Sequence, residues 1–104
     1  MLLAMDATVI NAKDFIDEKK PVIDSAAKVG DQAASILRAG GSVVVSVQDV
    51  RGVSSSFFNV ILSRVAIVLH NDFGDGRFEV QTGNKTQALI YQRSLDAVKR
   101  HGPQ

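Results

Sequence analysis

Residues 43–69 read VVVSVQDVRGVSSSFFNVILSRVAIVL and place a strand, a turn and a helix in direct succession. The β-branched run Val43–Val47 is typical of a strand. Because its apolar residues are nearly continuous, we expect both faces of this strand to be covered. A turn through Arg51 and Gly52 follows, and Ser54–Ser56 supply N-caps for an apolar helix that runs to Leu69.

The chain before this unit predicts one more strand and one more helix. Ala7–Ile10 is short and rich in β-branched residues, so we predict a strand that continues to Phe15. Mixed charges over residues 17–20 indicate a solvated connection. Apolar spacing within residues 31–38, with Gly30 just before them, predicts a helix.

The chain after the unit predicts a polar turn over residues 70–76, a strand at Phe78–Val80 and an amphipathic helix from Thr86 to about Arg100. The polar side of this last helix is expected to comprise Gln87, Arg93, Ser94, Asp96 and Arg100. We therefore predict one α/β domain over residues 1–104, in βαβαβα order. Its helices pack on a short, mainly parallel or mixed sheet, and residues 1–5 and 101–104 are expected to fray.

Composition excludes several classes of function. The 104 residues include no cysteine, which excludes a disulfide framework, a zinc–thiolate site and a cysteine nucleophile, and favours a cytoplasmic location. A formal net charge of +1 argues against nucleic-acid binding. No apolar run approaches the roughly 18 residues of a membrane span. The start lacks the basic region of a signal peptide, so we expect neither secretion nor membrane insertion.

The succession of strand, serine turn and apolar helix in residues 44–62 resembles the central motif of STAS domains, which occur in sulfate transporters and anti-sigma-factor antagonists. It is more similar to a STAS-like family of bacterial and phage-borne proteins, in which the turn leads into Ser-Ser-Phe, as at Ser55–Phe57 here. Ile10–Phe15 resembles the opening strand of that family, and Gly30 with the helical pair Ile36-Leu37 resembles its next element.

The resemblance implies a STAS-like fold and a non-enzymatic regulatory or adaptor module. Its implied partner is a protein, such as an ATPase or kinase of the anti-sigma type, bound at the serine-rich helix start. Ser55 matches the serine that is phosphorylated in the antagonists, whereas Ser54 replaces their aspartate and Phe57 their glycine. The candidate residues for partner binding or phosphate acceptance are Ser54, Ser55, Ser56, Phe57 and Phe58.

The serines also have a purely structural interpretation, because a serine oxygen at a helix start accepts from an unpaired N–H group. The same helix end favours an anion, so a phosphate there would be tolerated by the fold while repelling a docked partner. A catalytic serine is disfavoured, because the chain has no Gly-x-Ser-x-Gly motif and only His70 and His101 as bases.

The helix beginning at Phe57 has an unusually narrow polar stripe, which indicates that either the N-terminal segment or a partner covers it. Its candidate interface residues are Val60, Ile61, Val65 and Val68. The simplest partner is a second copy, so a structural homo-oligomer is one alternative function. A domain that binds a small ligand or a nucleotide is another.

Other motifs predict no metal site and no cofactor. Residues 82–86 resemble the end of a phosphate-binding loop, but Asn84 separates the glycine from the lysine. Residues 71–76 carry oxygen ligands without calcium-loop spacing, since Phe73 takes a ligand position, and therefore favour a surface turn. The two histidines have no partners at metal-ligand spacing.

Overall fold

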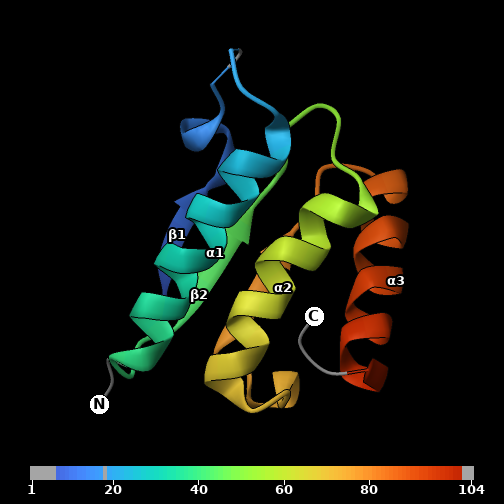
Figure 1. Ribbon diagram of the computed structural model, residues 1–104. Helices are drawn as coiled ribbons and strands as arrows, with labels where there is room; N and C mark the ends of the chain where they lie inside the picture. Colours follow the sequence, from blue (N-terminus) through green and yellow to red (C-terminus); the bar gives the residue numbers. More distant parts are fainter. Residues whose placement is uncertain (1–6, 18, 102–104) are drawn as a thin grey trace.

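The computed structural model describes residues 7–17 and 19–101 as an α/β fold in which strands and helices alternate. This confirms the predicted βαβαβα order (Figure 1). Residues 1–5 and 102–104, which were expected to fray, lie outside the described residues, and His101 ends the last helix. The elements are β1 (Thr8–Asn11), η2 (Ala12–Phe15), α1 (Val22–Arg38), β2 (Val43–Ser46), α2 (Ser55–Leu69), η3 (Phe73–Asp75), β3 (Phe78–Gln81) and α3 (Lys85–His101).

The three strands form a parallel sheet in the order β1-β2-β3, with Ile10 opposite Val45 and Val45 opposite Val80. Helices α1 and α2 cover one face of this sheet, and α3 packs beside α2 (Figure 1). For α1 and α2 the reason is topological, because each connects two strands and successive right-handed crossovers that move in one direction return both to the same side. The prediction that β2 is covered on both faces is therefore wrong for the described residues, and Val44 and Ser46 are only half-buried.

Helix α1 is longer than predicted and begins at Val22 rather than near Asp31. Gly30 lies inside it, because this is where α1 crosses α2. A Cβ on Gly30 would lie 3.2 Å from the Cα of Ile61 and 2.9 Å from the Cδ of Arg64. The glycine thus permits close helix packing instead of starting the helix.

Strand β1 is shorter than predicted. It ends at Asn11, and residues up to Phe15 form the 3₁₀ turn η2. Its only partner is β2, whose paired residues end at Ser46, so the chain beyond Asn11 has no ladder partner among the described residues. Ala12 turns into the core and is fully buried.

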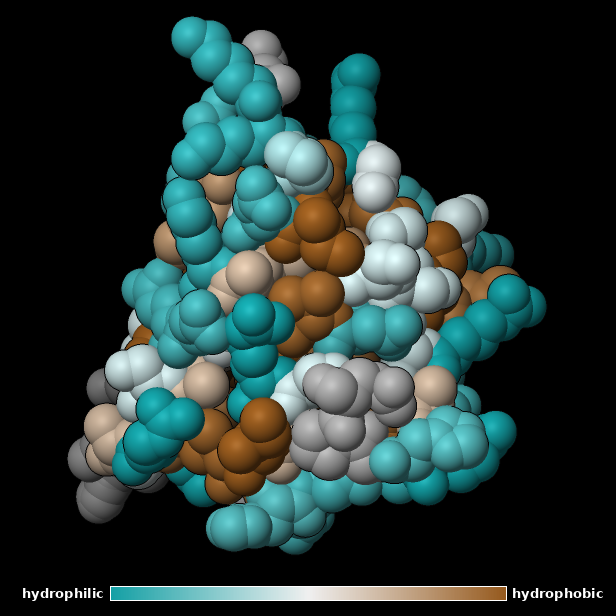
Figure 2. Space-filling view, in the orientation of Figure 1, coloured by the Kyte–Doolittle hydropathy of each residue, from teal (hydrophilic) through white to brown (hydrophobic). Residues whose placement is uncertain are grey.

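Helix α2 lies between α1 and α3 and supplies the centre of the core (Figure 1). Its apolar character is explained mainly by these neighbours and the sheet. On its outer side, Arg64 Nε donates to Asp31 Oδ1 at 2.7 Å, which ties α2 to α1. Hydrophobic surface gathers along the middle of the helix layer, with hydrophilic residues around it (Figure 2). The buried apolar residues of α2 are Phe57, Phe58, Ile61, Leu62, Val65, Ala66 and Leu69.

Within residues 7–17 and 19–101, the structure contains no helix that is both long and apolar enough to cross a membrane.

Candidate functional site at the carboxyl edge of the sheet

The carboxyl ends of three parallel strands bring three turns to one edge of the molecule. The turns are η2 after β1, residues 47–54 after β2 and residues 82–84 after β3. Open α/β sheets bind their ligands at this edge, where loops and helix N-termini converge. The predicted serine cluster lies here as well.

Ser54 is the N-cap of α2, as predicted, and its Oγ accepts a hydrogen bond from the N–H of Phe57 at 3.3 Å. Ser55 and Ser56 form the first two positions of the helix and are exposed. Among the described residues, their hydroxyl groups have no hydrogen-bond partner. The backbone of Ser55 is nevertheless held, because its carbonyl accepts from Ser94 Oγ at 3.4 Å. Ser54 thus stabilises the helix start, whereas the Ser55 and Ser56 hydroxyls are exposed.

The two phenylalanines that follow lie in the core, each 1% exposed. Their rings meet edge to face, with centroids 5.9 Å apart, and Phe58 makes the same kind of contact with Tyr91 of α3 at 5.3 Å. Burial, with a smaller contribution from the Glu79 carboxylate, raises the pKa of Tyr91 to about 12. Of the five candidates for partner contact, Phe57 and Phe58 therefore anchor the helix start, and only the three serines present surface.

The candidate interface on α2 is divided in the same way. Ile61 and Val65 are buried in the hydrophobic core, whereas Val60 and Val68 are half-buried at the outer side of α2. Ile67, which is not among the predicted interface residues, is 61% exposed. The sequence does not show which side of this helix faces the core, because nearly every position in the apolar run is hydrophobic.

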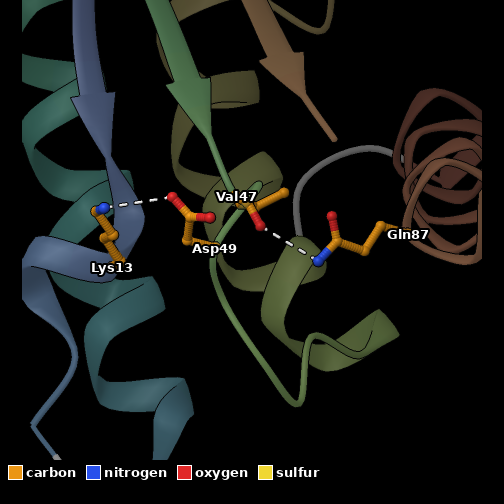
Figure 3. Close-up of polar contacts among 4 residues, drawn as sticks. All are labelled: Lys13, Val47, Asp49 and Gln87. Carbon is orange, nitrogen blue, oxygen red and sulfur yellow. Dashed lines mark hydrogen bonds and ion pairs between the residues drawn. The ribbon is translucent and has the colours of Figure 1, made fainter. Parts of the chain in front are cut away.

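Gln87 is the residue of this edge that no sequence motif indicates. It was assigned to the polar, solvent-facing side of α3, but it is buried, as is Ser94, so both assignments are wrong. Its Nε2 donates to the Val47 carbonyl at 3.2 Å (Figure 3) and to the Val50 carbonyl at 3.1 Å, and its Oε1 accepts from the Gly83 N–H at 2.7 Å. This side chain joins the turn after β2 to the turn after β3.

On the other side of the β2–α2 loop, Lys13 of η2 pairs with Asp49 at 3.3 Å (Figure 3). Both side chains are more than half exposed, so the pair contributes little to stability. It does place a cation and a carboxylate beside the loop, at the mouth of a cleft.

Two clefts flank the loop, and both are lined by Val50 and Arg51. The first, about 400 Å³, lies towards η2 and is also lined by Lys13, Ile16 and Asp49. The second, about 360 Å³, lies towards the start of α3. Val50 is buried at the base of the loop, so Arg51 projects from an anchored turn between the two clefts.

The remaining motifs have structural explanations. Residues 71–76 form a turn, as predicted, in which Asp72 Oδ1 accepts from the Gly74 N–H at 3.0 Å. His70 adopts a left-handed conformation, with φ 53°, at the end of α2. In the described part of the chain, no group of three or more His, Cys, Asp or Glu residues is arranged to hold a metal ion.

No protein-family model, no curated protein and no solved structure matches the chain.

Proposed function

We propose that this protein is a non-enzymatic regulatory or adaptor module that binds a partner protein through the start of α2. The observation that carries the proposal is the pair of exposed hydroxyls at Ser55 and Ser56. They lie on a helix start that is fixed to the core by the buried residues that follow. Phe57 and Phe58 fix this turn in the core, so the hydroxyls are presented on a rigid surface. The resemblance to STAS-like proteins supports the same surface and a partner such as an anti-sigma-type ATPase or kinase.

The helix start also suits control by charge. Ser55 is the first residue of α2, where the positive end of the helix dipole favours an anion. A phosphate on Ser55, carrying roughly −1.5 to −2 charge, would be compatible with the fold. The same charge would repel an acidic partner surface or prevent close packing on the serines. Ser55 is therefore the proposed position of a switch.

The test is a quantitative pull-down from lysate of the native host, comparing the wild type with Ser55→Asp. A matched control is Ser35→Asp, which adds the same charge at an exposed position in the last turn of α1. Loss of a captured partner by Ser55→Asp, with retention by Ser35→Asp, supports a charge-sensitive interface at the helix start. Equal capture by all three proteins, or no specific capture, contradicts the proposal and leaves the serines as caps.

A homo-oligomer is the second candidate, favoured by the 61% exposure of Ile67 beside half-buried Val60 and Val68. Light scattering on a sizing column tests it directly. A dimer that dissociates in Ile67→Glu supports self-association through the outer side of α2. A strict monomer at high concentration contradicts it.

A further inference from the structure

The cleft between the β2–α2 loop and the start of α3 has a lining suited to a small anion. Among the residues that the structure describes, Arg51 is the one charged member of that lining, and none of its members is a carboxylate. Asn84 and Thr86 contribute polar groups, while Val53 and Ile90 contribute apolar wall. The cleft on the other side of the loop is less suited, because Asp49 lies in it and neutralises Lys13.

The walls of the cleft are held by contacts that do not depend on a ligand. Gln87 bonds to the Val47 and Val50 carbonyls and closes the loop on one side. On the other side, Gly83 packs so tightly against Gln48 that a Cβ would lie 2.7 Å from the Gln48 carbonyl oxygen. Both turns are thereby fixed relative to each other, which lowers the conformational cost of binding between them.

The side-chain donor groups of three lining residues, Arg51, Asn84 and Thr86, have no partner among the described residues. Arg51 is exposed, and its guanidinium has no hydrogen bond or ion pair with any residue that the structure describes. Asn84 Oδ1 accepts from the Gln87 N–H at 2.8 Å, which leaves the Asn84 amide nitrogen as a donor. The Thr86 hydroxyl is likewise without a partner among the described residues. An oxyanion accepts hydrogen bonds from all three kinds of group.

We propose that this cleft binds a small oxyanion, a phosphate or carboxylate group of a small molecule, anchored by Arg51 and completed by Thr86 and Asn84. The positive end of α3 adds to the attraction without being its basis. The volume of about 360 Å³ fits a small metabolite around such a group. This inference does not rest on the proposed partner function, because the cleft takes a free small molecule and the serines are not in its lining.

The experiment is an NMR titration of the full ¹⁵N-labelled chain with inorganic phosphate and, separately, with acetate, at constant ionic strength. The expected result is a saturable shift of the Arg51, Gly52 and Thr86 amide signals with at least one of the two anions. Comparing the two anions separates a preference for phosphate from one for carboxylate. Arg51→Gln is expected to weaken binding on the order of tenfold, because a hydrogen bond to a charged group is lost.

Arg93→Gln is the matched control, since Arg93 is an exposed cation of α3 outside the cleft lining. It removes the same charge and is expected to leave binding unchanged. Thr86→Val keeps every charge and is expected to weaken binding by a smaller factor. The proposal is overturned if neither anion gives saturable shifts at these amides, or if Arg93→Gln weakens binding as much as Arg51→Gln.

Discussion

The starts of α2 and α3 lie at the same edge of the sheet and are built on the same local plan. Ser54 caps α2 by accepting from the Phe57 N–H, and Asn84 caps α3 by accepting from the Gln87 N–H. In both helices the first two residues are exposed and the third is buried. The third residue differs in kind, since Phe57 fills the core and Gln87 bonds to neighbouring backbone.

The two helix starts are therefore attached to the rest of the fold in different ways. An apolar third residue fastens the α2 start to the core and leaves its hydroxyls outward. A polar third residue fastens the α3 start to the adjacent loop and sets the shape of a cleft. The first arrangement presents a surface to a large partner, and the second encloses space for a small one.

The largest expected effect is that of removing the apolar anchor. Phe57→Ala should lower the free energy of unfolding by about 3–5 kcal/mol, because it leaves a cavity beneath the α2 start. Urea denaturation followed by circular dichroism measures the change. Phe57→Leu retains most of the volume and should cost clearly less. Equal losses in both variants would contradict the assignment of Phe57 to a closely packed site.

Removing the polar anchor should have the next largest effect. Gln87→Ala leaves the buried carbonyls of Val47 and Val50 without this donor and should cost about 1–3 kcal/mol. Gln92→Ala, at an exposed position of the same helix, is the control and should cost little. Hydrogen exchange should accelerate at Gly83 in Gln87→Ala, because its N–H loses the Oε1 acceptor. Unchanged exchange at Gly83 would show that Gln87 does not join the two turns.

The two helix starts show what local patterns can and cannot predict. The serine cap follows from a local pattern, since hydroxyls before an apolar run indicate a helix start, whereas Phe57 was expected to contact a partner and lies in the core. The bonds of Gln87 reach residues 40 and 37 positions away, so no local pattern shows that this glutamine is buried. An amide within a mostly polar helix looks solvent-facing, and only the tertiary fold brings two carbonyls to it.

The element order could be predicted because it follows from local patterns. The bounds of α1 and β1 could not be predicted, because they depend on tertiary contacts. Alternating strand and helix patterns suffice for a βαβαβα fold. Gly30, however, reads locally as the boundary of a helix and is used where α1 crosses α2. The end of β1 depends on how far β2 extends beside it. The cleft beside Arg51 is formed by two segments distant in sequence, the β2–α2 loop and the start of α3, and no sequence motif predicts it.

The contact between the two turns can be tested at Gly83. Gly83→Ala places a Cβ 2.7 Å from the Gln48 carbonyl oxygen and 3.0 Å from its Cα, so backbone must shift. We expect a net loss of about 1–2 kcal/mol in thermal or urea unfolding. Gly74→Ala is the control, because its nearest contact would be an ordinary 3.5 Å to Asp72 Oδ1. A Gly83→Ala protein as stable as the Gly74→Ala protein would mean that the turns are not closely packed.

The caps themselves should have similar, smaller effects. Ser54→Ala and Asn84→Ala should each lower stability by about 1 kcal/mol, because each leaves a first-turn N–H unpaired. Asn84→Ala is expected to cost more, since its hydrogen bond is shorter, 2.8 Å against 3.3 Å. Ser56→Ala removes a hydroxyl without a described partner and should be nearly neutral. A cost for Ser56→Ala equal to that for Ser54→Ala would contradict the assignment of Ser54 as the cap.

The smallest expected effect is a gain in the free energy of unfolding, and it determines how the pull-down is interpreted. Ser55→Asp puts a carboxylate on the first residue of α2 and should raise the free energy of unfolding by about 0.3–1 kcal/mol at low salt. Ser35→Asp, in the last turn of α1, should lower it by a similar amount, because the dipole there has the opposite sign. The helix end depresses the folded-state pKa of the new aspartate, so the gain is present above about pH 4 and is lost as pH falls through that lowered value. Thermal unfolding at pH 7 and at acidic pH measures both. A gain in stability at pH 7 means that any partner lost by Ser55→Asp is lost through charge at the interface and not through unfolding. A destabilised Ser55→Asp protein would show that the exposed helix start does not accept an anion.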